Sequence, residues 1–144
     1  MATRDGSGEW RGDLKSGSGT VSVASGLFTD GNFSFSSRFE EGTGTNPEEL
    51  IGAAHAGCFS MALSNMLAGD GHTPESVKTT AKVHLRMVDG VPTITQIDLI
   101  TEGRVPGLDQ AQFAEYAEQA KAGCPVSRAL AGVGEITLQA NFVG

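Results

Sequence analysis

Residues 44–63 read GTNPEELIGAAHAGCFSMAL, and this stretch decides the fold of the chain. Asn46 is a suitable helix N-cap, Pro47 suits the first helical position, and Glu49 stands where a capping box places an acid. The residues that follow are small or apolar nearly all round, which is typical of a buried helix rather than of one lying on a surface. We therefore expect a helix from Pro47 to about Leu67, ended by the glycines that follow it.

Alternating patterns on both sides of this helix predict strands. The clearest lies at 32–40, where Phe33, Phe35 and Phe39 share one face and Arg38 lies among serines on the other. The remaining elements that the patterns predict are strands at 10–14, 20–24, 81–87, 93–102 and 135–142, and helices at 109–122 and 124–130. This order of elements predicts an α+β fold with mainly antiparallel pairing.

The composition favours a single compact domain, 1–144, of ordinary globular material. The chain has 144 residues, is 39% hydrophobic and carries a formal net charge of −7. An acidic protein has no general attraction for phosphate backbones or anionic lipids, so we expect no nucleic acid and no membrane as partners. The N-terminal residues lack the apolar run of a secretory signal, and the apolar helix looks too short and mixed to span a membrane. A cytoplasmic protein is the resulting expectation.

The chain has two cysteines, Cys58 and Cys124, which are too far apart in sequence to form a CxxC pair. Two thiols in a cytosolic protein are usually reduced, and each is either an inert buried residue or a reactive one. Cys58 lies about three turns into the apolar helix, where burial alone would raise its pKa, so reactivity requires a cation from elsewhere. Cys124 precedes Pro125 at the start of a short helix, where free amide groups favour a thiolate. A disulfide between the two depends on whether the fold brings them together.

Arg38 is the candidate cation, because a guanidinium keeps its charge and offers forked donors; the alternative is a solvated strand arginine. Glu48 and Glu49 begin the helix, where either can complement its dipole, and which of them pairs with Arg38 stays open. At 100° per residue, Glu49 lies opposite Cys58, whereas Glu48 lies nearer the same side but about 15 Å away along the axis. Glu48 therefore cannot reach Cys58 of its own helix. A role for Glu48 predicts a homodimer, in which an antiparallel second copy supplies the sulfur.

Other side chains of this helix carry weaker signals. His55 stands three residues before Cys58, but no second pair at ligand spacing accompanies them, which indicates a hydrogen-bonded core histidine rather than a metal site. No phosphate-binding loop or dinucleotide fingerprint occurs, so we expect no metal and no cofactor. Phe59, Met61 and Leu63 form either part of the core or an apolar entrance that favours organic substrates.

The stretch 44–63 resembles the signature of the OsmC/Ohr family, and KAGCPVS at 121–127 resembles its second-cysteine motif. Further matches lie at 19–22, 37–40 and 135–138, so the resemblance covers essentially the whole chain. It is closer to the OsmC branch, because Arg38 falls in the Ser-Arg-Phe segment. The resemblance implies an intertwined homodimer with antiparallel sheets wrapped around two central helices. It also implies a peroxidase that acts on organic hydroperoxides and more weakly on hydrogen peroxide.

Carried over residue by residue, the resemblance implies that Cys58 attacks the peroxide and that Cys124 resolves the product as a disulfide. It implies that Arg38 stabilises the Cys58 thiolate and that Glu48 orients Arg38. A small or protein dithiol of the lipoyl type is the expected reductant. Two alternatives fit the same fold: a non-catalytic binder of apolar ligands with unreactive cysteines, and a redox sensor whose disulfide changes a partner interface. Thiol titration separates the binder, whose Cys58 has no depressed pKa.

Overall fold

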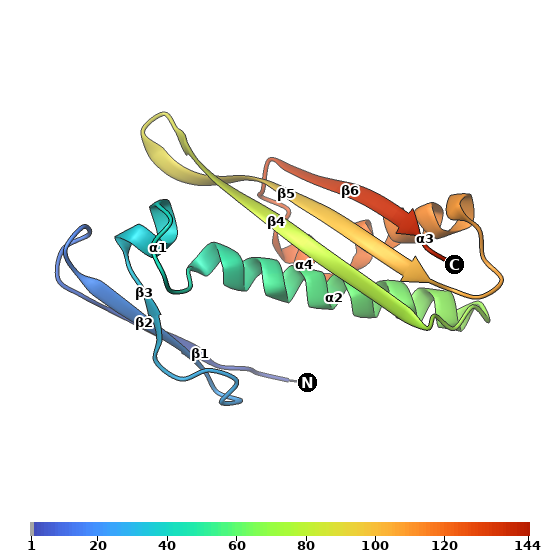
Figure 1. Ribbon diagram of the computed structural model, residues 1–144, viewed down its shortest axis with the longest axis horizontal. Coiled ribbons are helices and arrows are strands. Elements are labelled where there is room, and N and C mark those ends of the chain that lie inside the picture. Colours follow the sequence, from blue (N-terminus) through green and yellow to red (C-terminus); the bar gives the residue numbers. More distant parts are fainter. Residues whose placement is uncertain (1) are drawn as a thin grey trace. The chain divides into compact units, whose positions relative to one another are not determined.

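The computed structural model describes residues 2–144 and divides the chain into two compact units with a boundary after Leu50 (Figure 1). The N-terminal unit contains an antiparallel sheet of three strands in the order β1-β2-β3. Its elements are β1 (Gly6–Arg11), β2 (Ser18–Val23), β3 (Gly31–Phe33) and the short helix α1 (Phe35–Phe39). The strand expected at 10–14 is wrong beyond Arg11, because β1 lies at Gly6–Arg11, and the one expected at 20–24 is confirmed to within two residues.

The strand expected at 32–40 is wrong beyond Phe33, because the chain turns there into α1. Ser34 is the N-cap of this helix: its side chain accepts a hydrogen bond from the Ser37 amide, and the Ser37 side chain accepts one from the Ser34 amide. Phe35 and Phe39 are four residues apart, a spacing that places side chains on one face of a helix as well as of a strand. Their ring centroids lie 5.1 Å apart. Arg38 therefore lies on a helix and not on a strand.

The C-terminal unit holds a second sheet in the order β4-β5-β6, together with most of the long helix α2 (Figure 1). β4 and β5 are antiparallel and joined at Asp89 and Gly90, whose φ angles of 50° and 79° are left-handed. β5 and β6 are parallel, and α3 and α4 form the crossover between them. The bounds are α2 (Pro47–Gly69), β4 (Ser76–Val88), β5 (Val91–Arg104), α3 (Gln110–Gly123), α4 (Pro125–Ala129) and β6 (Glu135–Phe142).

The α+β class, the long helix from Pro47 and the last strand are confirmed. The Asn46 side chain accepts a hydrogen bond from the Glu49 amide at 2.7 Å, as expected of an N-cap. Asp109 caps α3 in the same way and shares a capping box with Gln112. The local signals at the helix starts therefore correspond to real caps.

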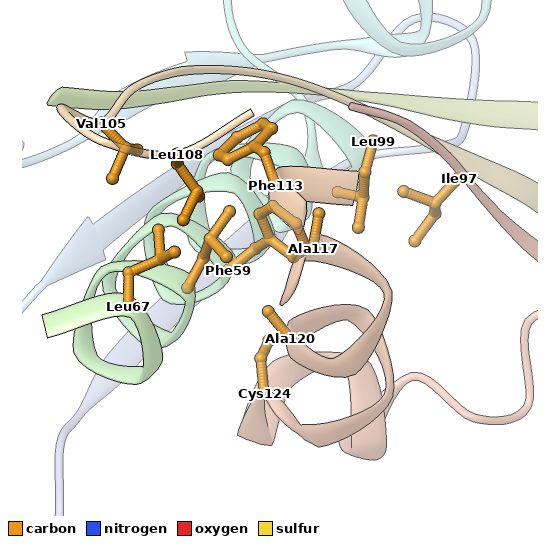
Figure 2. Close-up of a cluster of buried hydrophobic side chains, with 11 residues drawn as sticks. Phe59, Leu67, Ile97, Leu99, Val105, Leu108, Phe113, Ala117, Ala120 and Cys124 are labelled. Carbon is orange, nitrogen blue, oxygen red and sulfur yellow. The ribbon is translucent and has the colours of Figure 1, made fainter. Parts of the chain in front are cut away.

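Helices α2 and α3 pack against the same face of the β4-β5-β6 sheet and enclose the core of the C-terminal unit. Every fourth residue of α2 is fully buried, beginning with His55. Figure 2 shows the side chains of α2, α3 and β5 converging in this core. Its fully buried members include Phe59, Leu63, Leu67, Ile97, Leu99, Phe113 and Ala117. Phe59 and Leu63 are therefore core residues and do not form an entrance, whereas Met61 is 78% exposed.

The close approach of α2 to β4 fixes the position of Cys58. A side chain at Gly52 would meet the carbonyl oxygen of Ala81 at 3.1 Å, so glycine permits this approach. Two residues beyond Cys58, the Ser60 hydroxyl donates a hydrogen bond to Thr79 Oγ1 at 2.7 Å. The helix is thus anchored to β4 on both sides of the cysteine.

The remaining face of α2 is uncovered in the C-terminal unit. Its exposed residues are Ala53, Ala54, Gly57, Met61, Asn65 and Ala68. By length and composition α2 is apolar enough to cross a membrane, so the expectation that the segment is too short and mixed for a span was wrong. The buried face, with Phe59, Leu63 and Leu67 in the core, identifies it as the core helix of a folded unit.

Candidate active site

Arg38 and Glu48 form a forked ion pair within the N-terminal unit. Nε and Nη2 of Arg38 lie 3.1 and 2.9 Å from Oε1 of Glu48, and Nε lies 3.3 Å from Oε2. Glu48 is 6% exposed, and the guanidinium carbon lies 5.3 Å from the centroid of the Phe39 ring. The Glu49 side chain is exposed, and the Glu49 amide donates its hydrogen bond to the side chain of the N-cap residue Asn46. Of the two glutamates, Glu48 is therefore the one that holds Arg38.

An apolar hollow of about 250 Å³ lies beside the Arg38 side chain. It is lined by the rings of Trp10, Phe33, Phe35 and Phe39 together with Leu14, Ser34 and Arg38. The rings of Trp10 and Phe33 are packed with centroids 5.3 Å apart. An apolar lining with one charged group at its edge suits a small ligand that has a hydrocarbon part and a polar end.

Cys58 and Cys124 lie near each other in the C-terminal unit as two free thiols, close enough for each to shift the pKa of the other. Cys58 is half-buried on α2, and Cys124 is 1% exposed. Cys124 is at once the C-cap of α3 and the N-cap of α4, so its position is fixed by two helices. The fold thus brings together two sulfurs that are 66 residues apart in sequence.

The surroundings shift the pKa values of the two thiols in opposite directions. Burial raises the pKa of the Cys58 thiol, the Val126 amide opposes this, and the Cys124 sulfur raises it further. Burial also acts to raise the pKa of Cys124, but its hydrogen bonding with the side chain and amide of Ser127, together with Cys58 and the Val126 amide, outweighs this effect. The pKa of Cys124 is therefore lowered. As the sequence argument anticipated, nothing in the C-terminal unit makes Cys58 acidic.

Ser127 connects Cys124 to His55. The Ser127 amide donates to the Cys124 sulfur at 3.4 Å, and the Cys124 thiol donates to the Ser127 hydroxyl oxygen at 3.5 Å. That oxygen lies 2.6 Å from Nε2 of His55, a fully buried residue. Burial lowers the pKa of His55 and keeps its imidazole neutral. His55 is thus a hydrogen-bonded core histidine, as expected, although no role was assigned to Ser127 from the sequence.

The four predicted site residues form two pairs, Arg38 with Glu48 and Cys58 with Cys124. Within residues 2–144, no group of three or more His, Cys, Asp and Glu side chains is arranged to hold a metal ion. The signal that could have identified Ser127 is its position: in Cys124-Pro-Val-Ser127, the cysteine is an N-cap and the serine is the residue whose amide such a cap accepts.

Comparisons with known proteins agree with one another. The family model described as OsmC-like protein matches residues 40–139. Peroxiredoxin OsmC of Escherichia coli (strain K12) is 53% identical over 135 residues, which cover 94% of this chain and 93% of that protein. The organic hydroperoxide resistance protein of Xanthomonas axonopodis pv. citri (strain 306) is 33% identical over 100 residues, 67% of each chain.

A solved structure gives the same answer for the fold. The crystal structure of an organic hydroperoxide resistance protein from Elizabethkingia anophelis superposes with a TM-score of 0.75, covering 99% of this chain and 98% of that one. The two sequences are 23% identical, so this likeness supports the fold alone.

Proposed function

Because the chain belongs to the OsmC family, we propose that it is a cysteine-based peroxidase that reduces organic hydroperoxides, and more weakly hydrogen peroxide. The observation that carries the proposal is that the fold places the free thiols of Cys58 and Cys124 near enough for each to shift the pKa of the other. Two thiols that lie near each other are suited to close a disulfide and open it again. Relatives named peroxiredoxin and organic hydroperoxide resistance protein support the same class of reaction.

In the first step the Cys58 thiolate attacks the distal oxygen of the hydroperoxide, and the O–O bond breaks. The organic part leaves as an alkoxide that takes up a proton to become an alcohol, and Cys58 becomes a sulfenic acid. Since burial raises the pKa of Cys58, the thiolate needs a cation. We assign this role to Arg38, which Glu48 holds by its forked contact, and which also orients the peroxide oxygen.

In the second step Cys124 attacks the sulfenic acid sulfur, which gives the Cys58–Cys124 disulfide and releases water. A small or protein dithiol, of the lipoyl type, then reduces this disulfide by exchange and is itself oxidised to a disulfide. The lowered pKa of Cys124 suits a resolving thiol, because it raises the fraction of thiolate that attacks. No metal or organic cofactor takes part.

The active unit is a homodimer, in which each chain contributes one OsmC-like domain, 1–144. The uncovered face of α2, made mostly of alanine, glycine and Met61, fits a second copy of the same helix at close range. An antiparallel arrangement of the two helices brings Glu48 of one chain toward Cys58 of the other, which the 15 Å axial offset forbids within one helix. Two α2 helices at the centre of intertwined sheets are the expected architecture.

The hollow beside Arg38 supports an organic substrate. Its aromatic lining accommodates the hydrocarbon part, while the guanidinium at its edge binds the peroxide oxygen. Hydrogen peroxide lacks the apolar part and gains nothing from the lining. The protein acts in solution in the cytoplasm.

The test is steady-state peroxide consumption with a dithiol donor, dihydrolipoamide, comparing cumene hydroperoxide with hydrogen peroxide. The proposal predicts turnover with both and a higher kcat/KM for the organic substrate. Absence of turnover with either peroxide, in protein whose two thiols are reduced by titration, refutes it.

The raised pKa of Cys58 favours one rival, a binder of apolar ligands in the same hollow with unreactive cysteines. Titrating thiolate absorbance in a Cys124→Ala variant separates the two. The peroxidase requires a Cys58 pKa below the ordinary value of about 8.5, and the binder a higher one. A redox sensor is separated by turnover, since it oxidises once and does not cycle.

A further inference from the structure

A chain of three buried side chains leads from the resolving cysteine to a histidine on α2. Cys124, Ser127 and His55 are 1%, 6% and 0% exposed. The thiol of Cys124 donates to Ser127 Oγ at 3.5 Å, and Ser127 Oγ lies 2.6 Å from Nε2 of His55. Because the serine oxygen accepts a hydrogen bond from the thiol, the serine's own proton is directed at the imidazole nitrogen. The geometry is therefore that of a proton path from sulfur to imidazole.

We propose that Ser127 and His55 deprotonate Cys124 when it attacks the sulfenic acid on Cys58, so that Ser127 is a catalytic residue and His55 a positioning and proton-accepting residue behind it. This inference rests on the proposed function, in which Cys124 is the resolving thiol. It adds two residues to the reaction, neither of which is charged at rest.

The protons and electrons of this step balance within the site. The Cys124 thiol passes its proton to the Ser127 oxygen while the Ser127 proton moves to Nε2 of His55. The Cys124 sulfur then forms the S–S bond, and the S–O bond of the Cys58 sulfenic acid breaks and releases hydroxide. The imidazolium returns its proton to the Ser127 oxygen, and Ser127 gives its other proton to the departing hydroxide, which becomes water. Both sulfurs end at the oxidation level of a disulfide, and no further reactant is needed.

The surroundings of His55 suit a transient proton acceptor. Its Nδ1 has no hydrogen-bond partner within residues 2–144, so no carboxylate holds a proton on the ring between turnovers. Full burial lowers the pKa of His55, so the imidazole is neutral at rest and readily gives back any proton that it accepts. A histidine needed only to fill space in the core would leave a polar nitrogen unpaired at a cost that an apolar residue would avoid.

The same contacts also tie α2 to α4 across 72 residues, so a purely structural tether must be distinguished from a relay. His55→Gln keeps a hydrogen-bonding group at the reach of Nε2 but has no basic nitrogen. Ser127→Ala removes the hydroxyl, and Ser127→Thr keeps it. Thr137→Val is the matched control, because it removes another part-buried hydroxyl that bonds across the fold, one that pairs with Asp98 and not with sulfur.

The experiment mixes reduced protein with one equivalent of cumene hydroperoxide and quenches it at successive times with an alkylating reagent and dimedone. Intact-mass analysis then counts chains as thiol, sulfenic acid or disulfide. We expect Ser127→Ala and His55→Gln to accumulate Cys58 sulfenic acid and to form the disulfide about 100-fold more slowly than the wild type. Ser127→Thr restores much of the rate, and Thr137→Val forms the disulfide as the wild type does.

A second readout does not depend on turnover. In a Cys58→Ser background, the thiolate absorbance of Cys124 gives its pKa, which Ser127→Ala raises by about one unit and Ser127→Thr does not. Disulfide formation at the wild-type rate in His55→Gln overturns the relay, because a tether then suffices. Failure of the proposed function looks different: the wild type itself forms neither sulfenic acid nor disulfide.

Discussion

The guanidinium of Arg38 contacts both carboxylate oxygens of Glu48, and the glutamate is almost fully buried in the first turn of α2. A carboxylate that is buried and paired in this way is rigid, so the orientation of the cation is set by the helix start. The Asn46 N-cap and Pro47 fix where that helix begins. The same short sequence therefore defines both the long helix and the position of the proposed activating charge.

Replacing Arg38 tests the activating role directly. Arg38→Met is expected to slow Cys58 oxidation about 100-fold, because a donor to the developing charge is lost. Arg38→Lys is expected to restore little of the oxidation rate, because the point charge of an ammonium cannot reproduce the forked contact of a guanidinium. Glu48→Gln is expected to slow Cys58 oxidation about tenfold. Stopped-flow measurement of thiol oxidation checks all three. Arg11→Met is the control: Arg11 pairs with Glu9 at 2.7 Å, but both side chains are mostly exposed, and wild-type rates are expected.

A charge on the uncovered face of α2 tests the homodimer. Met61→Lys is expected to shift the particle mass from twice the 14.9 kDa of the chain to a single chain, because an ammonium group does not pack against a second apolar helix. Light scattering after size-exclusion chromatography measures this, and Gln119→Lys on the exposed surface of α3 is the control. The site is expected to lose activity with the dimer. A monomer that retains full peroxidase activity contradicts the shared site.

Acid sensitivity is expected from Asp98, on the face of the second sheet opposite the core. Hydrogen bonds from Gln96, Thr137 and His84 hold the pKa of this carboxyl far below its usual range. A lowered folded-state pKa contributes stability above the unfolded value of about 3.9, and this contribution is lost as the pH falls. Urea unfolding should therefore show Asp98→Asn less stable than the wild type at pH 7, with a difference that shrinks below about pH 4. A difference independent of pH would argue against a role for the carboxylate charge.

Phe59 tests the core position next to Cys58. Because its ring is fully buried, Phe59→Ala is expected to lower the free energy of unfolding by about 3–5 kcal/mol. Leu27→Ala, at a residue that is 83% exposed, is expected to change it by less than about 0.5 kcal/mol. Chemical denaturation measures both. Equal small effects would mean that Phe59 belongs to an adaptable entrance after all.

Signals confined to a few neighbouring residues predicted the structure well. The Asn46 and Asp109 caps, the Asp89-Gly90 turn and the strand at 135–142 are all where the sequence indicates them. For the two caps and the turn, the deciding interaction joins residues at most three positions apart, so the sequence order contains it.

Features that depend on distant residues or on ambiguous spacing were not predictable. The Phe35–Phe39 spacing fits a helix and a strand equally well, and only the reciprocal Ser34–Ser37 bonds decide between them. The parallel pairing of β5 with β6 depends on how the chain crosses over, which no local pattern contains. The tie between His55 and Ser127 joins residues 72 positions apart, and for that reason Ser127 was assigned no role.

The central claim is that Cys58 is oxidised first and that Cys124 then resolves it. The direct measurement is single-turnover mass spectrometry of Cys124→Ala and Cys58→Ser, each mixed with excess cumene hydroperoxide and dimedone. Cys124→Ala is predicted to consume one equivalent of peroxide per chain and to carry one dimedone adduct on Cys58, without further cycling. Cys58→Ser is predicted to consume none. Rapid oxidation of Cys124 in the Cys58→Ser protein, with Cys58 inert in the other, would reverse the two roles and contradict this account.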